Sequence, residues 1–228
     1  MENPYWPLFD LRIRTPRVEI RLPNDDNLQS LARLAAKGVH DPATMPFLHS
    51  WTDEPSPQLE QGMMRWGWRH RAEWTSNEWT FTGAVFVRGD PVGVQSLMAS
   101  NFAARRAVKT GSWLGLAHQG QGIGKEMRTA ILHFAFEDLS ALEAHSGGFF
   151  DNASSLSVSR ALGYEEIGRR TTQRRGVPAE MLELRLDRSK WSTTEHTAVE
   201  VSGLESCLEF FISPQNGDVE KGPDALST

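Results

Sequence analysis

The sequence predicts a mixed α/β fold, classed as α+β, in which helices flank a central sheet of about seven strands. Apolar residues recur at every second position in segments such as residues 18–22, as in a half-buried strand. They recur at helical spacing in others, such as residues 28–35. A glycine-rich turn at residues 119–124 lies between an extended run and a helical run. We therefore expect the chain to be organised around a strand, a tight turn and a helix.

Length and composition favour one domain with C-terminal additions. The chain has 228 residues, of which 39% are hydrophobic and 23% are charged, as in ordinary folded domains. We expect one domain over residues 1–192. An appendage over residues 193–212 would hold a strand near 197–201 and a short helix near 204–211. Residues 213–228 are polar, with glycine and proline, and we expect a disordered tail there.

Charge and residue usage argue against several classes of protein. A net charge of −5 and a pI of about 5.8 do not suit a nucleic-acid partner, which requires a basic surface. No run of about 18 apolar residues and no basic-then-apolar N-terminus is present, so we expect neither a membrane span nor an export signal. The single cysteine, Cys207, agrees with a reducing cytoplasm. The seven histidines show no ligand-type spacing, so no metal site is expected.

The first half of the chain predicts a strand, two helices and a hairpin. After the strand at residues 18–22, a turn leads into a helix that Gly38 ends. A second helix spans residues 58–73. Strands at residues 79–87 and 92–98 follow, and the Gly, Asp and Pro between them are typical of a short hairpin turn.

Aromatic and methionine residues concentrate between residues 45 and 74. The segment 41–57 is irregular yet rich in apolar residues, which indicates packing over the domain or the wall of a pocket. The helix that follows carries a stripe of apolar residues at helical spacing: Leu59, Met63, Met64, Trp66 and Trp68. Such a stripe is usually core. A pocket that determines specificity is the alternative, and Trp51 and Trp68 are its candidate residues.

The second half predicts the remaining strands and two helices. An extended run over residues 107–116 precedes the glycine-rich turn, and a helix of about 15 residues follows the turn. A strand at residues 143–150 and a helix at 154–162 come next. Two closing strands, at residues 164–173 and 179–187, complete the expected sheet.

The glycine-rich turn, Gln119-Gly120-Gln121-Gly122-Ile123-Gly124, has the properties of a phosphate cradle. Glycines let the backbone turn sharply and expose successive N–H groups, and the following helix adds free donors and its positive dipole end. A nucleotide P-loop is disfavoured because Gly124-Lys125 is followed by Glu126, and the glycine spacing does not fit the dinucleotide fingerprint. A tight turn without a ligand is the structural alternative.

Two motifs resemble those of the GNAT superfamily of N-acetyltransferases. The spacing Gln-x-x-Gly-x-Gly, from Gln119 to Gly124, resembles the coenzyme A pyrophosphate loop of that family. Downstream, Asn152, Ser155 and then Leu162-Gly163-Tyr164 match its Asn-x-x-Ser and Leu-Gly-aromatic pattern. Residues 14–22 look like the opening strand of the ribosomal-protein alanine acetyltransferase branch. The resemblance covers roughly residues 12–192.

The resemblance implies a GNAT-type sheet, mixed and largely antiparallel, that is splayed at the coenzyme A site. The strand before the cradle would pair with the pantetheine arm, the cradle would bind pyrophosphate, and the Asn-x-x-Ser motif would lie beside the thiol. The implied cofactor-binding residues are Leu114, Leu116, Gln119, Gly120, Gln121, Gly122, Ile123, Gly124, Lys125, Asn152 and Ser155.

The catalytic groups are less well defined by the sequence. Acyl transfer needs a neutral amine, a stabilised oxyanion and a protonated thiolate. Ser155 is the candidate proton donor to the thiolate, although the start of an Asn-capped helix explains the same hydroxyl. The resemblance puts Lys109 where many relatives carry a Glu that acts as the general base. A lysine could take that role only if its pKa were lowered by a large amount. Asp151 and His118 are candidates for the base, and water-mediated deprotonation is the third alternative.

The sequence thus predicts an N-acyltransferase with acetyl-CoA, or another acyl-CoA such as succinyl-CoA, as co-substrate. The acceptor would be a primary amine of a small molecule or of a peptide or protein N-terminus. Arg65, Arg69 and Arg71 could pair with a carboxylated acyl chain, or could be ordinary surface charges. The alternative, motivated by Lys109, is a CoA-binding regulatory or interaction module with little turnover. Monomer and homo-oligomer both stay open.

Overall fold

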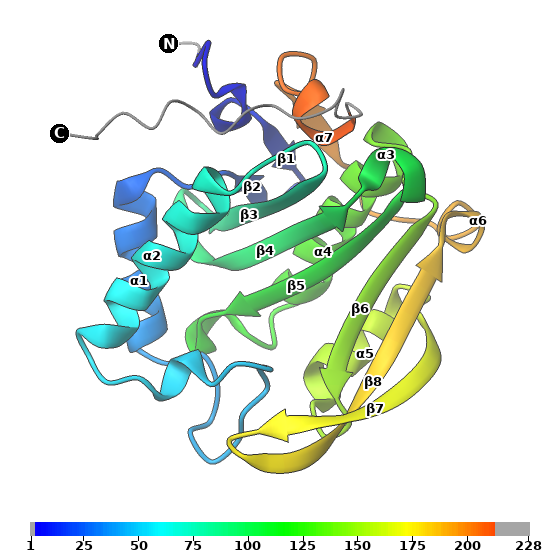
Figure 1. Ribbon diagram of the computed structural model, residues 1–228. Coiled ribbons are helices and arrows are strands. Elements are labelled where there is room, and N and C mark those ends of the chain that lie inside the picture. Colours follow the sequence, from blue (N-terminus) through cyan, green and yellow to red (C-terminus); the bar gives the residue numbers. More distant parts are fainter. Residues whose placement is uncertain (1–2, 213–228) are drawn as a thin grey trace, which may run out of the picture.

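Nine strands form one sheet in the part of the chain that the computed structural model describes, residues 3–212 (Figure 1). Their spatial order is β7-β8-β6-β5-β4-β3-β2-β1-β9, and every neighbouring pair is antiparallel except β5 and β6. The mixed, largely antiparallel sheet is confirmed. Beyond the expected seven, β9 (Glu200–Ser202) overlaps the additional strand expected near residues 197–201, whereas β1 (Arg12–Arg14) was not predicted.

Two long helices cover one face of the sheet, and the strands beneath them come from the first half of the chain. The elements are β2 (Glu19–Arg21), α1 (Asp25–Ala36), α2 (Gln58–Ala72), β3 (Glu78–Val87), β4 (Asp90–Ser100) and the single turn α3 (Phe102–Arg105). Helix α1 begins at the predicted turn because Asn24 accepts a hydrogen bond from the Asn27 backbone N–H. The predicted hairpin of β3 and β4 is confirmed.

The second half of the chain supplies the other layer and the far side of the sheet. Its elements are β5 (Ala107–Leu114), α4 (Ile123–His133), β6 (Glu143–Phe149), α5 (Ala153–Ala161), β7 (Glu165–Arg174), β8 (Val177–Asp187), α6 (Arg188–Trp191) and α7 (Glu209–Ile212). Helix α4 continues into a π turn at Phe134–Asp138, which accounts for the predicted length of about 15 residues. The extended run expected to reach Leu116 ends at Leu114, because Leu116–His118 forms a 3-10 turn.

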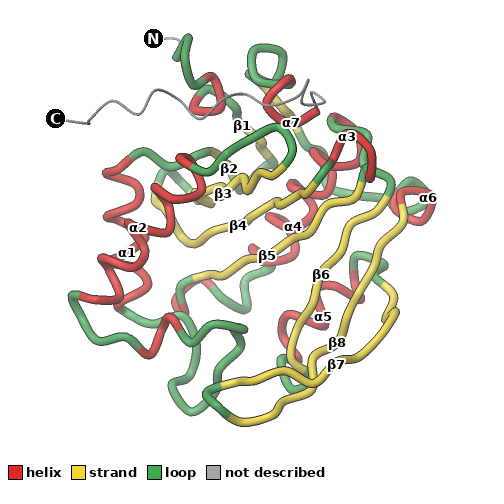
Figure 2. The backbone as a smooth tube through the Cα atoms, in the orientation of Figure 1, coloured by secondary structure: helices red, strands yellow, loops and turns green. Residues whose placement is uncertain are grey.

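Helices lie on both faces of the sheet (Figure 2). Phe81 packs with Ile131 and Phe134 on the face that α4 covers, and all three are fully buried. Ala84 and Val94 pack under α1 and α2 on the other face. This two-sided burial explains why β3 and β4 are almost continuously apolar. No helix of the described residues is both long and apolar enough to cross a bilayer.

The outer strand β7 has a different character. Its side chains are mostly exposed and include Glu166, Arg169 and Arg170. A bulge between Glu166 and Gly168 interrupts its pairing with β8. The far edge of the sheet is therefore charged and irregular.

Residues 193–212, expected to form an appendage with a strand and a short helix, contribute to the sheet and the core. Strand β9 pairs with β1, and Phe211 is fully buried. The indole N–H groups of Trp74 and Trp79 donate to the backbone carbonyls of Phe210 and Phe211, each at 3.1 Å. The predicted disorder of residues 213–228 lies outside the described residues.

We predict that Phe211→Ala destabilises the fold by about 3–5 kcal/mol, because it removes a fully buried ring from a close-packed cluster. The Phe211 ring lies 5.0 Å from that of Trp79 and 5.4 Å from that of Phe134. Urea unfolding measures the change, with Ile212→Ala, at a half-exposed neighbour, as the control. Equal effects of the two substitutions would contradict the assignment of this segment to the core.

Candidate functional site

Strands β5 and β6 part in the middle of the sheet. They pair over only three positions, the last being Lys109 opposite His145. Beyond them β5 stays with β4 and β6 stays with β8, so the two strands diverge (Figure 1). We call the space between residues 110–114 and 146–149 the splay. Its backbone edges can pair with an extended ligand, as a strand is added to a sheet.

The glycine-rich turn lies at the end of β5, where the splay is widest. Gly120 and Gly122 have φ of 72° and 79°, a left-handed conformation that favours glycine. Gly122 is the N-cap of α4, and no side chain accepts a hydrogen bond from the start of this helix. The N–H groups of its first turn are therefore left for a ligand or water. An anion would be stabilised there by these donors and by the helix dipole.

Two glutamine side chains shape this turn. The Gln119 amide donates to the carbonyls of Val39 and Leu114, at 2.7 and 2.8 Å. The Gln121 amide donates to the Ala117 carbonyl at 2.8 Å. Both amide nitrogens are engaged within the protein, so these residues offer a ligand their backbone rather than their side-chain donors.

Glu126, the residue that excluded a P-loop, fastens the turn to the opening strands. Its carboxylate is 8% exposed and accepts from the Thr15 hydroxyl and from Arg17 Nε, both at 2.6 Å. Arg17 Nη1 also donates to the Gln121 carbonyl at 3.2 Å. Burial by itself would raise the pKa of Glu126, but the hydrogen bonds from Thr15 and Arg17 lower it below its ordinary value. Sequence analysis missed this role because it depends on a contact across more than 100 residues.

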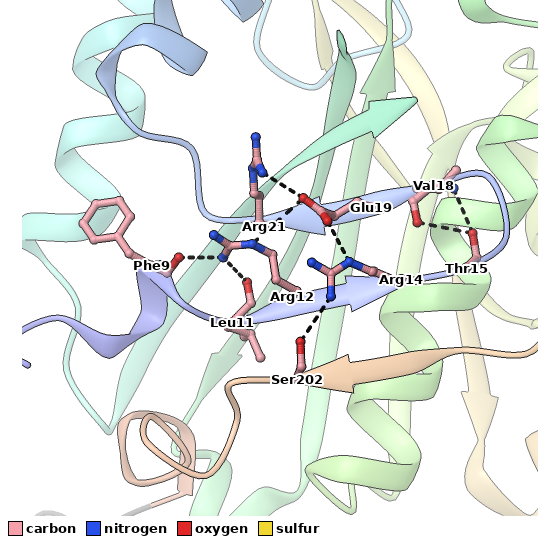
Figure 3. Close-up of polar contacts among 9 residues, drawn as sticks. All are labelled: Phe9, Leu11, Arg12, Arg14, Thr15, Val18, Glu19, Arg21 and Ser202. Carbon is pink, nitrogen blue, oxygen red and sulfur yellow. Dashed lines mark hydrogen bonds and ion pairs between the residues drawn. The ribbon is translucent and has the colours of Figure 1, made fainter. Parts of the chain in front are cut away.

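Three arginines of β1 and β2 gather around Glu19 (Figure 3). Glu19 accepts from Arg14 at 2.7 Å and from Arg21 at 2.9 Å, and Arg12 lies 3.9 Å from it. Three guanidinium groups thus share one carboxylate. An adjacent pocket of about 390 Å³ is lined by Arg14, Arg21, Arg88 and also Arg17, which contacts the turn. This surface is locally basic on an acidic protein and would attract phosphate groups.

The Asn-x-x-Ser motif lies on the β6 side of the splay. Asn152 caps α5, and its side-chain oxygen accepts from the Ser155 backbone N–H at 3.2 Å. The Ser155 hydroxyl forms no hydrogen bond with the described residues and faces Gly148 of β6. The structure therefore places Asn152 in a capping role and Ser155 with its hydroxyl free at the strand edge.

Asp151, one of the candidates for the base, is held in an ion pair. Arg174 donates to both of its carboxylate oxygens, at 2.7 and 2.9 Å. The hydrogen bond from Arg174 lowers the pKa of Asp151 below its ordinary value. A carboxylate with a lowered pKa is a weak base. His118 lies in the 3-10 turn, at the opposite end of β5 from Lys109.

A histidine that sequence analysis missed stands where β5 and β6 part. His145 is the partner of Lys109, and its Nε2 lies 3.0 Å from a Glu143 carboxylate oxygen. Ser146 faces α4, so His145 and Glu143 face the other side of the sheet, where α1 and α2 lie. The only signal in the sequence was the Glu-x-His spacing on a strand, which is too common to indicate a site.

An aromatic wall flanks the splay on the side of α1 and α2. The rings of Phe47 and Trp51 lie 5.2 Å apart, and Trp51 lies 5.8 Å from Trp113 of β5. At the open end, Arg175 from the β7–β8 turn donates to both oxygens of Asp53, at 2.7 and 2.5 Å. The segment 41–57 and the β7–β8 hairpin are therefore joined there.

The second pocket candidate, Trp68, lies apart from Trp51. It is 46% exposed, and its indole N–H donates to Asp25 at the start of α1. Arg71 pairs with the same carboxylate, whereas Arg65 and Arg69 are exposed on α2. Among the described residues, no three His, Cys, Asp or Glu side chains converge in a way that could hold a metal ion.

Comparison with known proteins agrees with this geometry. A family model described as an acetyltransferase (GNAT) domain matches residues 17–165. A ribosomal-protein-S5-alanine acetyltransferase from Vibrio fischeri is similar in structure, with a TM-score of 0.60, 17% identity and coverage of 79% of this chain and 98% of that one. A ribosomal L7/L12 alpha-N-protein acetyltransferase in complex with coenzyme A has a TM-score of 0.62 at 16% identity, covering 77% and 97%. A spermidine N-acetyltransferase that is a chimera of the Vibrio cholerae protein and hSSAT has a TM-score of 0.62 at 14% identity, covering 78% of this chain and 99% of that one.

We predict that Glu126→Gln lowers the free energy of unfolding at pH 7 by about 1–3 kcal/mol, because the hydrogen bonds from Thr15 and Arg17 lose their charged acceptor. Because the folded-state pKa is lowered, this stabilisation is present above the unfolded-state value of about 4.3 and is lost as pH falls through the folded-state pKa. Denaturant unfolding between pH 7 and pH 3 measures the difference. Glu54→Gln, at an exposed residue, is the control. A difference between parent and variant that does not shrink in acid would contradict the role of this carboxylate.

Proposed function

This chain belongs to the GNAT acetyltransferase family, and on that premise we propose that it acetylates a primary amine that reaches the splay from the side of α1 and α2. It is an acyl-CoA-dependent N-acyltransferase, and acetyl-CoA is its co-substrate. The observation that carries the proposed site is the parting of β5 and β6 after Lys109 and His145. The splay runs from the glycine-rich turn at one end of β5 toward these two residues at the other.

The residues present suit coenzyme A. The uncapped start of α4 and the backbone of Gly120 to Gly124 would hold the pyrophosphate, with Arg17 beside them. The free edge of residues 110–114 would align the pantetheine arm, so that proximity supplies much of the rate. Ser155, whose hydroxyl is free at the opposite edge, would donate a proton to the departing thiolate.

For the base, we propose His145 supported by Glu143. His145 lies beside Lys109, the position where the family resemblance expects a Glu, and on the face from which the amine would arrive. The Glu143 carboxylate can orient the imidazole and stabilise its charged form after proton uptake. Asp151 is the weaker candidate because Arg174 occupies both of its oxygens.

We propose that the acceptor amine ends a slender chain, such as a polyamine or a peptide N-terminus. The aromatic wall of Phe47, Trp51 and Trp113 and the junction of Arg175 with Asp53 bound the approach. Acetyl is favoured over succinyl because Arg71 is already paired and Arg65 and Arg69 are exposed on α2. The cytoplasm is the proposed compartment, where the free thiol of buried Cys207 would stay reduced.

A thiol-release assay tests this function. Acetyl-CoA and succinyl-CoA are each offered with spermidine, with short peptides carrying a free N-terminus and with the same peptides N-terminally blocked. Turnover of acetyl-CoA that requires a free amine supports the proposal. Coenzyme A binding without thiol release for any amine would favour the alternative, a regulatory or interaction module with little turnover.

We predict that Gly122→Val abolishes coenzyme A binding in a folded protein. Valine at φ of 79° is strained, and its Cβ would lie 3.3 Å from Arg17 Nη2 at the start of α4. Isothermal calorimetry with coenzyme A measures the loss, and circular dichroism checks the fold. Gly176→Val, in the β7–β8 turn at φ of 77° and with no heavy atom near its added Cβ, is a control for backbone strain away from the cradle. Unchanged affinity in the Gly122 variant would rule out the cradle.

We predict that His145→Asn lowers kcat by about 10²–10⁴-fold with little change in coenzyme A affinity, as expected for loss of a general base. Asp151→Asn should leave kcat close to that of the parent, because the Asp151 carboxylate is engaged in an ion pair with Arg174. Steady-state kinetics with the best amine of the panel compares the two. The reverse order of effects would return the role of base to Asp151.

A further inference from the structure

A buried arginine spans the floor of the splay. Arg128, on the second turn of α4, is 4% exposed. Its Nη2 donates to the Ser112 hydroxyl of β5 at 3.1 Å, and its Nη1 lies 3.4 Å from the Ser146 hydroxyl of β6 and 3.5 Å from that of Ser159. Ser112 and Ser146 both lie beyond the last paired positions of the two strands. The guanidinium therefore bridges the strands from below, just after they part.

The charge of Arg128 has no counter-ion among the described residues. No carboxylate there pairs with it, its polar neighbours are the hydroxyl groups of three serines and of Tyr164, and its buried Nε has no hydrogen-bond partner. Burial lowers the pKa of Arg128, an effect that the neighbouring Tyr164 opposes, but arginine keeps its proton in proteins. An unpaired buried cation is costly, and groups of this kind gather at functional sites.

Two of these serines can transmit the effect of the Arg128 charge to a ligand in the splay. The Ser112 and Ser146 oxygens accept from the guanidinium, so their own hydroxyl protons stay free to be donated elsewhere, whereas Ser159 donates its proton to the Ser155 carbonyl at 3.2 Å. Ser112 is only partly buried, at the β5 edge. A ligand that fills the splay would meet a positive charge and hydroxyl donors polarised by it.

We propose that Arg128 stabilises the negative charge that develops on the thioester during acyl transfer, first on the carbonyl oxygen and then on the sulfur. This inference rests on the proposed function. The amine nitrogen attacks the carbonyl carbon and the C–N bond forms, then the C–S bond breaks and its electron pair leaves with sulfur. The proton released by the amine goes to the base. Arg128 exchanges no proton in this sequence; it supplies fixed charge in a water-poor site.

A permanent carboxylate on the acyl chain would be a poorer ligand for Arg128 than charge that develops on the thioester. Both terminal nitrogens of Arg128 already donate to serines, so the guanidinium has no free fork for a bidentate pair. Negative charge that develops only during the reaction does not need a free guanidinium fork, because the serine hydroxyls can stabilise it while they stay bound to Arg128.

The test is the ionisation of bound coenzyme A, which needs no acceptor. The ultraviolet absorbance of the thiolate is titrated in complexes with the parent, Arg128→Gln and Arg128→Lys, and calorimetry compares coenzyme A with desulfo-coenzyme A across the same pH range. Arg33→Gln, at an exposed position of α1, controls for the change in net charge. We expect the parent to lower the pKa of the bound thiol by at least about one unit below that of free coenzyme A titrated under the same conditions. Arg128→Gln should abolish this shift, whereas Arg128→Lys and Arg33→Gln should keep it.

Several outcomes would overturn the inference. A bound thiol that ionises alike in the parent and in folded Arg128→Gln removes Arg128 from the reaction. Calorimetry with acetyl-CoA and succinyl-CoA adds a second check: a loss of affinity in Arg128→Gln that is confined to succinyl-CoA would assign Arg128 to a carboxylate. If Arg128→Gln does not fold, Ser112→Ala retains the guanidinium and must still reduce the shift; an unchanged shift contradicts the proposal. Failure of the parent to bind coenzyme A would instead refute the proposed function itself.

Discussion

The parting of β5 from β6 is the constraint on which the rest of the structure depends. A sheet buried on both faces cannot leave backbone donors and acceptors unpaired at its centre without a substitute partner. Here the two strands separate after three pairs, and nearly every feature of the site lies along the resulting edges. The glycine-rich turn closes one end, His145 stands at the other, and Arg128 supports the floor between them.

The layers of the fold keep that opening in place. Strand β5 is tied to β4 over its length, and β6 is tied to β8, so each edge belongs to a rigid hairpin or ladder. Glu126 binds the opening strands to the turn, and Gln119 binds the turn to the end of α1. A ligand in the splay would thus meet groups that are already positioned, which is the condition for electrostatic stabilisation at low reorganisation cost.

What could be predicted from the sequence was local. Glycine spacing predicts the turn from Gln119 to Gly124, and apolar periodicity predicts the helix after it. The roles of Glu126, Arg128 and His145 could not be predicted, because each depends on which strands meet and in which register. Strand β1 was missed because only Leu11 and Ile13 alternate there, whereas Val18, Ile20 and Leu22 extend the alternation through β2. The helical spacing of Trp68 could be read from the sequence, but its exposure and its hydrogen bond to Asp25 could not.

The outer strand β7 bears on how copies of this chain can associate. An edge strand of ten residues would ordinarily invite a second sheet to extend it. In β7, Arg169 and Arg170 are engaged with Glu180 and Glu183 of β8, and the bulge at Glu166 breaks the regular row of backbone groups. A neighbouring strand would have to follow an irregular edge that is lined with charged side chains. Continuous sheet growth through β7 is therefore disfavoured, and a homo-oligomer of this chain would have to form through a different surface.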